Sequence, residues 1–174
     1  SVSSWSRHNS HFFNNKTIAE LVLYLLYLYN KSIDYMEVKI KKLNENAVIP
    51  QYAHPTDAGL DLVAVSKRKD KDGNFVYGTG IAFEIPEGFV GLVFPRSSVS
   101  ARCMTMANCV GVIDSGYIGE VTVKFRQHLF AKPYDKGDRV AQMIIMPYPH
   151  IDFVEVDELS ESERGDGGYG STGK

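Results

Sequence analysis

The sequence predicts an all-β fold, either a β-barrel or a jelly-roll-like sandwich. Between residues 36 and 158, short apolar runs alternate with gaps that are rich in Gly, Pro, Asn and Asp. Such gaps are typical of the turns between strands. Apart from one run near the N-terminus, no window keeps the 3.6-residue period of an amphipathic helix. Short strands without intervening helices favour sheets that pack on each other or close on themselves.

Seven segments are expected to form strands, because each is apolar and is bounded by turn residues. They are residues 38–43, 60–65, 80–85, 89–94, 104–110, 120–126 and 140–146. The segment 66–80 is charged and ends in glycines, so we expect a solvated hairpin loop without chemistry. With 174 residues, 44% of them hydrophobic, the chain suffices for one domain with a packed core.

Residues 1–35 differ in composition from the rest of the chain. Residues 1–15 are polar, and an apolar run interrupted by Glu20 spans residues 18–29. This run is shorter than the about 20 residues that cross a bilayer, and its flanks do not fit a signal peptide. We expect a short helix in an N-terminal extension, 1–35, with the core domain at 36–158. The domain is expected to begin at Met36, and an upstream reading-frame artefact is one origin for the residues before it.

Charge and cysteine content exclude several classes of partner. Lys and Arg number 19 and Asp and Glu number 21, so the chain lacks the basic excess of a duplex-DNA surface. Cys103 and Cys109 are too few for a disulfide scaffold and have no metal-ligand spacing. The five histidines likewise show no zinc-binding pattern. We expect a cytoplasmic protein with reduced thiols and with neither a nucleic acid nor a membrane as partner.

The C-terminal residues 159–174 are expected to form a flexible arm. The chain is acidic up to Glu163 and glycine-rich from residue 164 to residue 173. Terminal polar segments usually fray, so a disordered end is one interpretation. The same composition suits a loop that closes over an anion, because glycines let main-chain N–H groups converge and Arg164, Ser171 and Thr172 add donors.

Five short segments carry a resemblance to a known family. They are residues 57–62 (DAGLDL), 95–99 (PRSSV), 111–114 (GVID) with Tyr117 and Gly119, 137–142 (GDRVAQ) and 164–173. Their order and spacing resemble the trimeric dUTPase family across nearly all of residues 36–173. The resemblance implies a jelly-roll-like domain and a homotrimer in which the arm of one subunit closes over a pocket made by the other two. It also implies hydrolysis of dUTP to dUMP and pyrophosphate, which limits uracil in DNA and supplies dUMP for dTMP synthesis.

Asp114 carries the chemistry that this resemblance implies. The reaction needs a water molecule to attack the α-phosphorus of a nucleoside triphosphate. A carboxylate within hydrogen-bond reach can orient that water and take its proton. The family aspartate at this position has that role. On composition alone, Asp114-Ser115-Gly116 is also a good hairpin turn, and without the other segments the turn is the favoured interpretation.

The residues around Asp114 match those that select the nucleoside in the family. Tyr117 matches a tyrosine that packs under the deoxyribose and leaves no room for a 2′-hydroxyl. Asn108 and the main chain around Gly111, Val112 and Ile113 match the hairpin that reads uracil and excludes the thymine methyl. A site that pairs with O4 and N3–H of uracil leaves its own polar groups unpaired against cytosine, which discriminates strongly.

The other segments match the family's phosphate-binding parts. Arg96, Ser97 and Ser98 resemble the turn that binds phosphates with a guanidinium fork, hydroxyls and N–H groups. Gln142 resembles a glutamine near the α-phosphate, and Asp61 and Gln142 resemble the residues that contact metal-bound water. Mg²⁺ is expected to be held mainly by the three phosphates, because it keeps several of its waters. No residue is expected to bind the metal directly.

The arm is expected to complete the site. Arg164 matches the residue that meets the γ-phosphate, and Tyr169 stands where the family usually has an aromatic ring that stacks on uracil. Closure of the arm would exclude bulk water and strengthen the polar contacts inside. The expected contacts of the arm come from Arg164, Gly168, Tyr169, Gly170, Ser171 and Thr172.

Two alternative functions remain open at this point. The related dCTP deaminases, including bifunctional dCTP deaminase–dUTPases, share the fold and the pattern around Tyr117. They need a glutamate on the following strand, and Lys124 stands at that position. The second segment also departs from the family, because it has Ser98 where Gly is more frequent. A non-catalytic dUTPase-like regulatory module is the other alternative, although such a module would have no need of Asp114.

Overall fold

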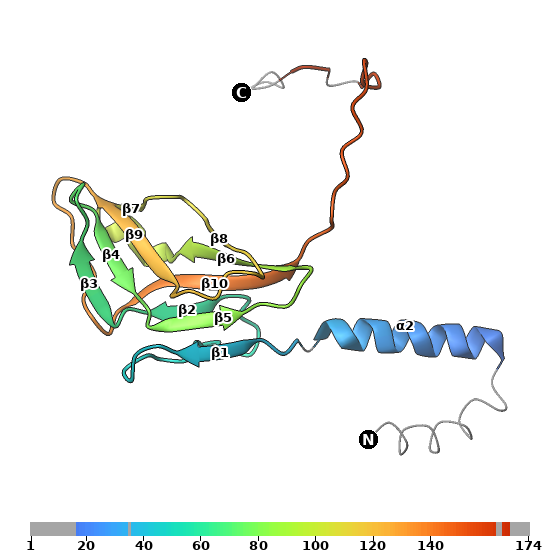
Figure 1. Cartoon of the computed structure of the whole chain (residues 1–174), viewed down its shortest axis with the longest axis horizontal. Coiled ribbons are helices and arrows are strands. Elements are labelled where there is room, and N and C mark those ends of the chain that lie inside the picture. The colour runs from blue at the N-terminus through green and yellow to red at the C-terminus, as the bar shows by residue number, and fades with distance from the viewer. Residues whose placement is uncertain (1–16, 35, 163–164, 168–174) are drawn as a thin grey trace.

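The computed structural model describes residues 17–34, 36–162 and 165–167 of the 174-residue chain. Strands dominate this part of the chain, and every pairing between them is antiparallel (Figure 1). The elements are α2 (Ile18–Asp34), β1 (Lys39–Lys42), β2 (Leu60–Val63), β3 (Ser66–Lys69), β4 (Phe75–Gly78), β5 (Ile81–Glu84), β6 (Phe89–Pro95), the 3₁₀ helix η1 (Ser97–Ala101), β7 (Met104–Met106), β8 (Gly111–Ile113), β9 (Thr122–Gln127) and β10 (Arg139–Pro147).

Two four-stranded sheets form the body of the domain. One has the strand order β2-β10-β6-β8 and the other has the order β3-β4-β9-β7. A separate two-stranded sheet pairs β1 with β5. The consecutive strands of the chain therefore cross repeatedly between sheets. The all-β class and the jelly-roll-like sandwich are confirmed, and the described strands form separate sheets rather than one closed barrel.

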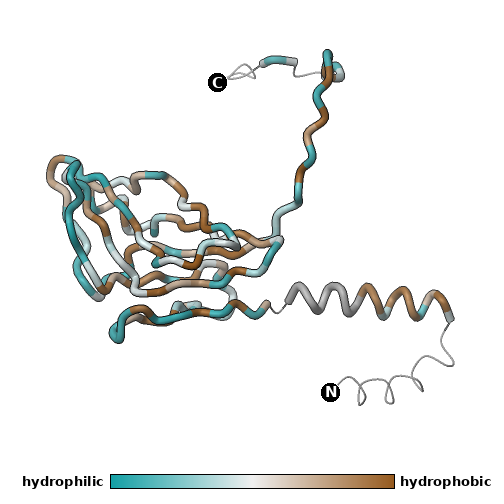
Figure 2. The backbone as a smooth tube through the Cα atoms, viewed as in Figure 1, coloured by the Kyte–Doolittle hydropathy of each residue, from teal (hydrophilic) through white to brown (hydrophobic). Residues whose placement is uncertain are grey.

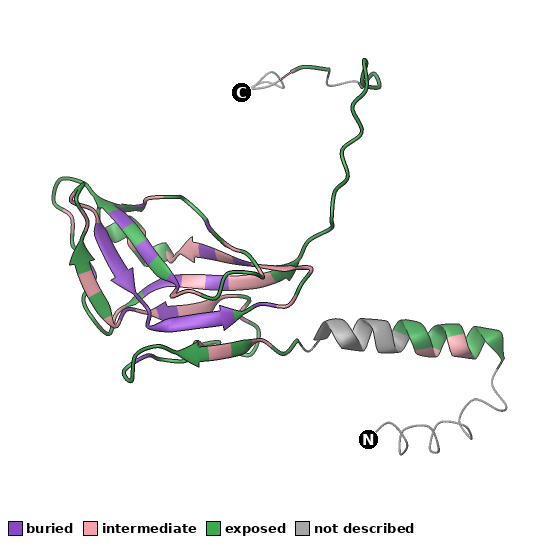
Figure 3. Ribbon diagram, in the orientation of Figure 1, coloured by how far each residue is buried: buried purple, intermediate pink, exposed green. Residues whose placement is uncertain are grey.

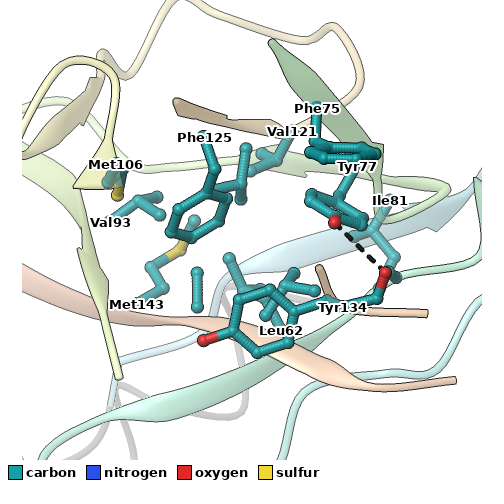
Figure 4. Close-up of a cluster of buried hydrophobic side chains, with 14 of the residues drawn as sticks. Leu62, Phe75, Tyr77, Ile81, Val93, Met106, Val121, Phe125, Tyr134 and Met143 are labelled. Carbon is teal, nitrogen blue, oxygen red and sulfur yellow. Dashed lines mark hydrogen bonds between the residues drawn. The ribbon is translucent and has the colours of Figure 1, made fainter. Parts of the chain in front are cut away.

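The core lies between the two four-stranded sheets (Figures 3 and 4). Tyr77 of β4 and Phe125 of β9 face Leu62 of β2 and Met143 of β10, and all four are fully buried. The Tyr77 ring makes edge contacts with the rings of Phe125 and Tyr134 at centroid distances of 6.0 and 5.9 Å. Burial raises the pKa of Tyr77 to about 12, so its hydroxyl stays protonated at neutral pH.

The segment 66–80 is not the solvated loop that its charge and glycines predict. It is the β3–β4 hairpin, and residues 75–80 are all buried. β3 is charged and mostly exposed, whereas β4 is apolar and buried. At the polar tip, Asp70 accepts hydrogen bonds from the main chain of Asp72 and Asn74 and from Lys124 Nζ. The bond from Lys124, at 2.9 Å, is the main reason why the pKa of Asp70 lies well below its usual range. The sequence prediction failed here because β4 is buried on both faces and so lacks an alternating pattern.

The expected strand 104–110 is also wrong in extent. β7 ends at Met106, and a turn closed by a hydrogen bond from Cys109 N to Met106 O follows it. Cys109 adopts the left-handed conformation, with φ of 59°. This turn carries the chain from one sheet to the other, where β8 begins at Gly111. The apolar composition runs through the turn, so the pattern alone gave no boundary.

The helix α2 lies beside the sandwich rather than within it (Figure 1). Its start is a capping box: Glu20 N donates to Thr17 Oγ1, and Thr17 N donates to Glu20 Oε2. Several of its apolar side chains are exposed, including Ile18, Leu23 and Leu25. The expected helix in this extension is confirmed. No helix among the described residues is long and apolar enough to span a bilayer.

The chain leaves the sandwich after β10. Residues 151–162 have no regular secondary structure and are exposed. Polar and apolar residues are interspersed along this segment (Figure 2). Phe153 and Leu159 expose 93% and 88% of their surface. The sandwich of this one chain therefore does not bury the apolar side chains of residues 151–159.

Two buried tyrosine hydroxyls provide a matched test of the core. The Tyr77 hydroxyl donates to the main-chain oxygen of Tyr134 at 3.1 Å, whereas the buried Tyr134 hydroxyl has no partner among the described residues. We expect Tyr77→Phe to lower the free energy of unfolding by about 1–2 kcal/mol, because it leaves a buried carbonyl unpaired. Tyr134→Phe should leave stability unchanged or raise it. Urea denaturation of both variants checks this, and equal losses would contradict the assigned hydrogen bonding.

Candidate active site

The segment that carries Asp114 stands at the edge of a sheet. β8 is the last strand in the order β2-β10-β6-β8 and, of the strands that the structure describes, pairs with β6 alone. On its other edge the main-chain N–H and C=O groups have no strand partner within this part of the chain. These are the groups that can read the edge of a base by hydrogen bonds. Gly111, Val112 and Ile113 form this strand, so the structure brings these three predicted residues together at the sheet edge.

A tight turn follows β8 and orients Asp114 and Tyr117. The Tyr117 N–H donates to the Asp114 carbonyl at 3.0 Å, which closes the turn. The Tyr117 hydroxyl donates to the main-chain oxygen of Glu120 at 2.8 Å. Both side chains are exposed and border one hollow of about 160 Å³. Its lining residues are Val112, Ile113, Asp114, Tyr117, Glu120, Val121 and Thr122.

A larger hollow, of about 610 Å³, lies on the other side of the same turn. Its lining includes Ser115 and Gly116 from the turn, the carboxylates of Glu37, Glu84 and Glu87, and Lys39, which pairs with Glu84 at 2.8 Å. The smaller hollow also carries two carboxylates, Asp114 and Glu120, so charge does not distinguish the two. The smaller hollow is the candidate for the nucleoside because Asp114 and Tyr117 both border it.

A second cluster forms on the neighbouring strands of the same sheet. Arg96 follows β6, and its Nε donates to Asp61 Oδ1 at 2.7 Å. Arg139 donates from NH1 to Asp61 Oδ2 at 3.0 Å. The Asp61 side chain is only 18% exposed and has one arginine on each oxygen. Among the described residues the terminal nitrogens of Arg96 have no partner, so this cluster offers fixed cationic donors to an anion.

Gln142 belongs to the same cluster. It lies opposite Asp61 in the β10–β2 register and opposite Phe94 in the β10–β6 register. Its Nε2 donates to the Pro95 carbonyl at 3.2 Å. Gly59 leaves the room for this side chain, because a Cβ there would lie 2.7 Å from Gln142 Oε1.

The remaining predicted residues fall into three groups. Ser97 and Ser98 are exposed at the start of η1, directly after Arg96. Asn108 borders a different hollow, beside Lys124 and Arg126, that shares Thr122 with the Asp114 hollow. The arm residues Arg164, Gly168, Tyr169, Gly170, Ser171 and Thr172 lie outside the described residues.

Sequence reasoning missed Arg139 and Gly59. Both stand inside segments that carried the resemblance, at residues 137–142 and 57–62. The positive charge of Arg139, within a segment that resembles a phosphate-binding part of the family, could have made it a candidate. Its pairing with Asp61, 78 positions away, had no signal in the sequence.

The two clusters lie far apart within one chain. Ile113 pairs with Gly91 across the β8–β6 ladder, so Asp114 is level with Val90. Arg96 lies six residues further along the same strand, just past its end. At about 3.3 Å per residue this is a separation of roughly 20 Å along β6. A general base and the side chains that bind the phosphate under attack cannot act on one substrate over that distance.

The donor set around Asp61 bears on how a metal ion could be held. Both oxygens of Asp61 already face arginines, so a bare divalent cation is not favoured against them. Each carboxylate oxygen keeps a further lone pair that can accept a hydrogen bond from water. No group of three or more His, Cys, Asp or Glu residues within the described ranges has the arrangement of a metal site. The residues around Asp61 therefore fit a hydrated ion better than a bare one.

Comparison with known proteins identifies the family. The sequence profile of the dUTPase family matches residues 45–173. The deoxyuridine 5′-triphosphate nucleotidohydrolase of Corynebacterium glutamicum is 43% identical over 145 residues, which are 81% of this chain and 97% of that protein. The protein of the same name from Nautilia profundicola is 43% identical over 142 residues, which are 80% of this chain and 100% of that protein.

Solved structures agree with these relatives. The dUTPase of Staphylococcus bacteriophage 80alpha, solved with dUpNHpp, is 30% identical and superposes with a TM-score of 0.69, covering 79% of this chain and 99% of that chain. A mutant dUTPase from phage phi11 of S. aureus, described as coordinating a structural Mg(II) ion, is 26% identical with a TM-score of 0.59, covering 71% of this chain and 98% of that chain. On this evidence the chain belongs to the dUTPase family.

Proposed function

We propose that this protein hydrolyses dUTP to dUMP and pyrophosphate, with Asp114 as the base. The observation that carries the proposal is the chemistry of the two clusters. One joins a carboxylate and a tyrosine ring at a small hollow beside a free strand edge. The other holds Arg96 and Arg139 on a half-buried carboxylate. The first suits a nucleoside and the second suits its phosphates, and relatives over 40% identical carry the name of this activity.

The two clusters are proposed to meet between subunits of a homotrimer. Their separation of roughly 20 Å along β6 means that one chain cannot supply both halves of a site. A second copy can place its Arg96 beside the Asp114 of the first. The exposed apolar residues of the segment 151–159 support an assembly in which this segment packs on another copy and takes the arm to a neighbouring site.

In the proposed mechanism Asp114 orients a water molecule for in-line attack on the α-phosphorus. The water oxygen bonds to phosphorus, its proton passes to the Asp114 carboxylate, and the bond to the bridging oxygen breaks to release pyrophosphate. Arg96 and Gln142 bind the phosphates and hold the α-phosphorus in place. Asp61 keeps the Arg96 guanidinium in one orientation, so less ordering is needed when the substrate binds.

Mg²⁺ is proposed to enter with the triphosphate, with Asp61 and Gln142 in contact with its waters. When bound it would neutralise charge on the phosphate oxygens and so ease attack by a nucleophile. Asp61 can accept a hydrogen bond from metal-bound water while it remains paired with two arginines. Ser97 and Ser98 add hydroxyl and N–H donors at the phosphates.

Selection of the nucleoside is proposed to use the β8 edge and Tyr117. Main-chain groups of Gly111, Val112 and Ile113 would pair with O4 and N3–H of uracil, with Asn108 at the rim. The Tyr117 ring would lie under the deoxyribose and exclude a 2′-hydroxyl. The cytoplasm is the proposed location, which suits two exposed free cysteines in a reducing compartment. There the reaction would limit uracil in DNA and provide dUMP for dTMP synthesis.

A deaminase of the same fold is the second candidate, and the described geometry disfavours it. Deamination of dCTP needs an acid–base group near the base. Lys124, which stands at that position in the sequence, donates to Asp70 at 2.9 Å on the other sheet. The phage 80alpha dUTPase is described as controlling transfer of virulence genes, but among the described residues of this chain no feature favours a regulatory module without catalysis.

A nucleotide panel tests the reaction class. With Mg²⁺ present, we expect pyrophosphate release from dUTP and little from dTTP, dCTP or UTP. The polar groups of the site would leave cytosine mispaired, the main chain around residues 111–113 would exclude the thymine methyl, and the ring of Tyr117 would exclude ribose. Ion chromatography of products measures both pyrophosphate and ammonia. Release of ammonia from dCTP would overturn the proposed hydrolysis in favour of deamination.

Mixing two inactive variants tests the shared site. Asp114→Asn should bind dUTP but lose several orders of magnitude in kcat, because the carboxylate acts in the transition state. Arg96→Ala should lose phosphate binding. If sites are shared, unfolding and refolding the two variants together in equal amounts should restore activity at about a quarter of the sites. A mixture as inactive as its components would show that both halves come from one chain.

Removal of residues 164–174 tests the arm. The buried core of the described residues is built from residues 47–143, so we expect the truncated protein to keep its unfolding midpoint and oligomeric mass. Its kcat/KM for dUTP should fall by about a hundredfold or more, because the phosphates lose donors and gain water. Full activity of the truncated protein would refute the closing role of the arm.

A further inference from the structure

The position of the Tyr117 ring is set by its neighbours in the chain. The ring folds back over Gly119, where a Cβ would lie 2.6 Å from the Tyr117 hydroxyl oxygen and 2.7 Å from Cζ. Its hydroxyl donates to the Glu120 carbonyl at 2.8 Å. The side chain is 44% exposed, so burial in the core does not fix it. The ring therefore depends on these two local contacts for its orientation.

Space, not backbone conformation, explains the glycine at position 119. Glycine is usually required where φ is positive, and that is the case for Gly80 and Gly137. Gly119 is not among the residues with positive φ, so an alanine could adopt its backbone conformation. What an alanine cannot do is share the space of the Tyr117 ring.

Glu120, whose carbonyl accepts from the Tyr117 hydroxyl, is itself held by the buried residues that join β4 to β5. Glu120 Oε1 accepts from Gly80 N at 2.8 Å. Val121, the next residue, donates from N to Ile81 O at 2.9 Å and accepts from Thr79 Oγ1 at 2.8 Å. Thr79 and Val121 are at most 1% exposed. This clamp, residues 79–81 on residues 120–121, ties the segment 114–119 after β8 to the core.

We propose that Gly119 and Glu120 are positioning residues that set the Tyr117 ring for selection of deoxyribose over ribose. Gly119 provides the space that the ring occupies, and Glu120 provides the anchored carbonyl that holds its hydroxyl. A ring that is held in one place excludes a 2′-hydroxyl better than a ring that can swing aside. The inference rests on the proposed function, because it specifies how that site discriminates between two sugars.

A matched pair of glycine variants tests the proposal. Gly119→Ala places a methyl group in the space of the Tyr117 ring, whereas Gly116→Ala places one in the same connection between β8 and β9 with nothing within 4 Å. The readout is the ratio of kcat/KM for dUTP to kcat/KM for UTP. We expect Gly119→Ala to lower this ratio by about tenfold or more. The value of kcat/KM should decrease for dUTP and increase for UTP. Gly116→Ala should keep the wild-type ratio.

A second pair tests the anchor without a steric change. Tyr117→Phe keeps the ring and removes only its hydroxyl, so the ratio should fall several-fold in a folded protein. Glu120→Ala should do the same because it frees residues 120–121 from Gly80, and Glu120→Gln should restore the ratio because it keeps an acceptor oxygen. A purely structural role for Glu120 would change the unfolding midpoint and leave the ratio alone.

The outcomes separate this inference from the proposed function. A wild-type protein that does not hydrolyse dUTP would overturn the proposed function. A wild-type protein that is selective for dUTP, with the ratio unchanged in Gly119→Ala, would overturn the positioning role only. If Gly119→Ala does not fold, as shown by circular dichroism, Tyr117→Phe decides: an unchanged ratio in that variant also overturns the role.

Discussion

The position of β6 between β10 and β8 is the constraint on which the rest of the site depends. Its ladder with β10 brings Gln142 level with Phe94, beside the end of the strand where Arg96 follows. Its ladder with β8 places Asp114 near the opposite end, level with Val90. One strand thus aligns the cluster around Asp61 and Arg96 with the turn that carries Asp114 and Tyr117, and it also keeps the two apart. Core packing, through Val93 and Met143, fixes both registers because a slip by one residue would turn buried side chains outward.

The charges of the site are organised around Asp61. A half-buried carboxylate with an arginine on each oxygen keeps two long side chains in place before any ligand is bound. The net charge of this group of three is positive, which suits phosphates and disfavours a bare metal ion. Gly59 contributes only by its lack of a side chain, which leaves space for Gln142. The nucleoside half uses no such cluster, because an edge strand already presents polar main-chain groups.

The sequence predicted the class of fold and most strands, because apolar runs between turn residues are a local signal. It failed for β4, where burial on both faces removes the alternation, and for the turn at Cys109, where apolar composition continues through a change of sheet. Asp114, Tyr117, Arg96 and Gln142 could be chosen as candidates by their resemblance to a family. Their arrangement in space could not be predicted. The hydrogen bonds of Arg139 to Asp61 and of Gly80 to Glu120 join residues that are far apart in the chain.

The distance between Asp114 and Arg96 along β6 affects how activity depends on protein concentration and how defective gene copies combine. Under the proposed shared-site arrangement, an isolated chain holds two incomplete halves and is inert, so activity would decline faster than protein concentration on dilution below the assembly threshold. A chain with one defective half would still join assemblies, where its intact half could complete a site with a normal chain. In an equal mixture with normal chains about half of the sites would stay intact, so such a defect would cost no more than the loss of one gene copy. Two chains with defects in different halves, however, could compensate for each other in the same cell.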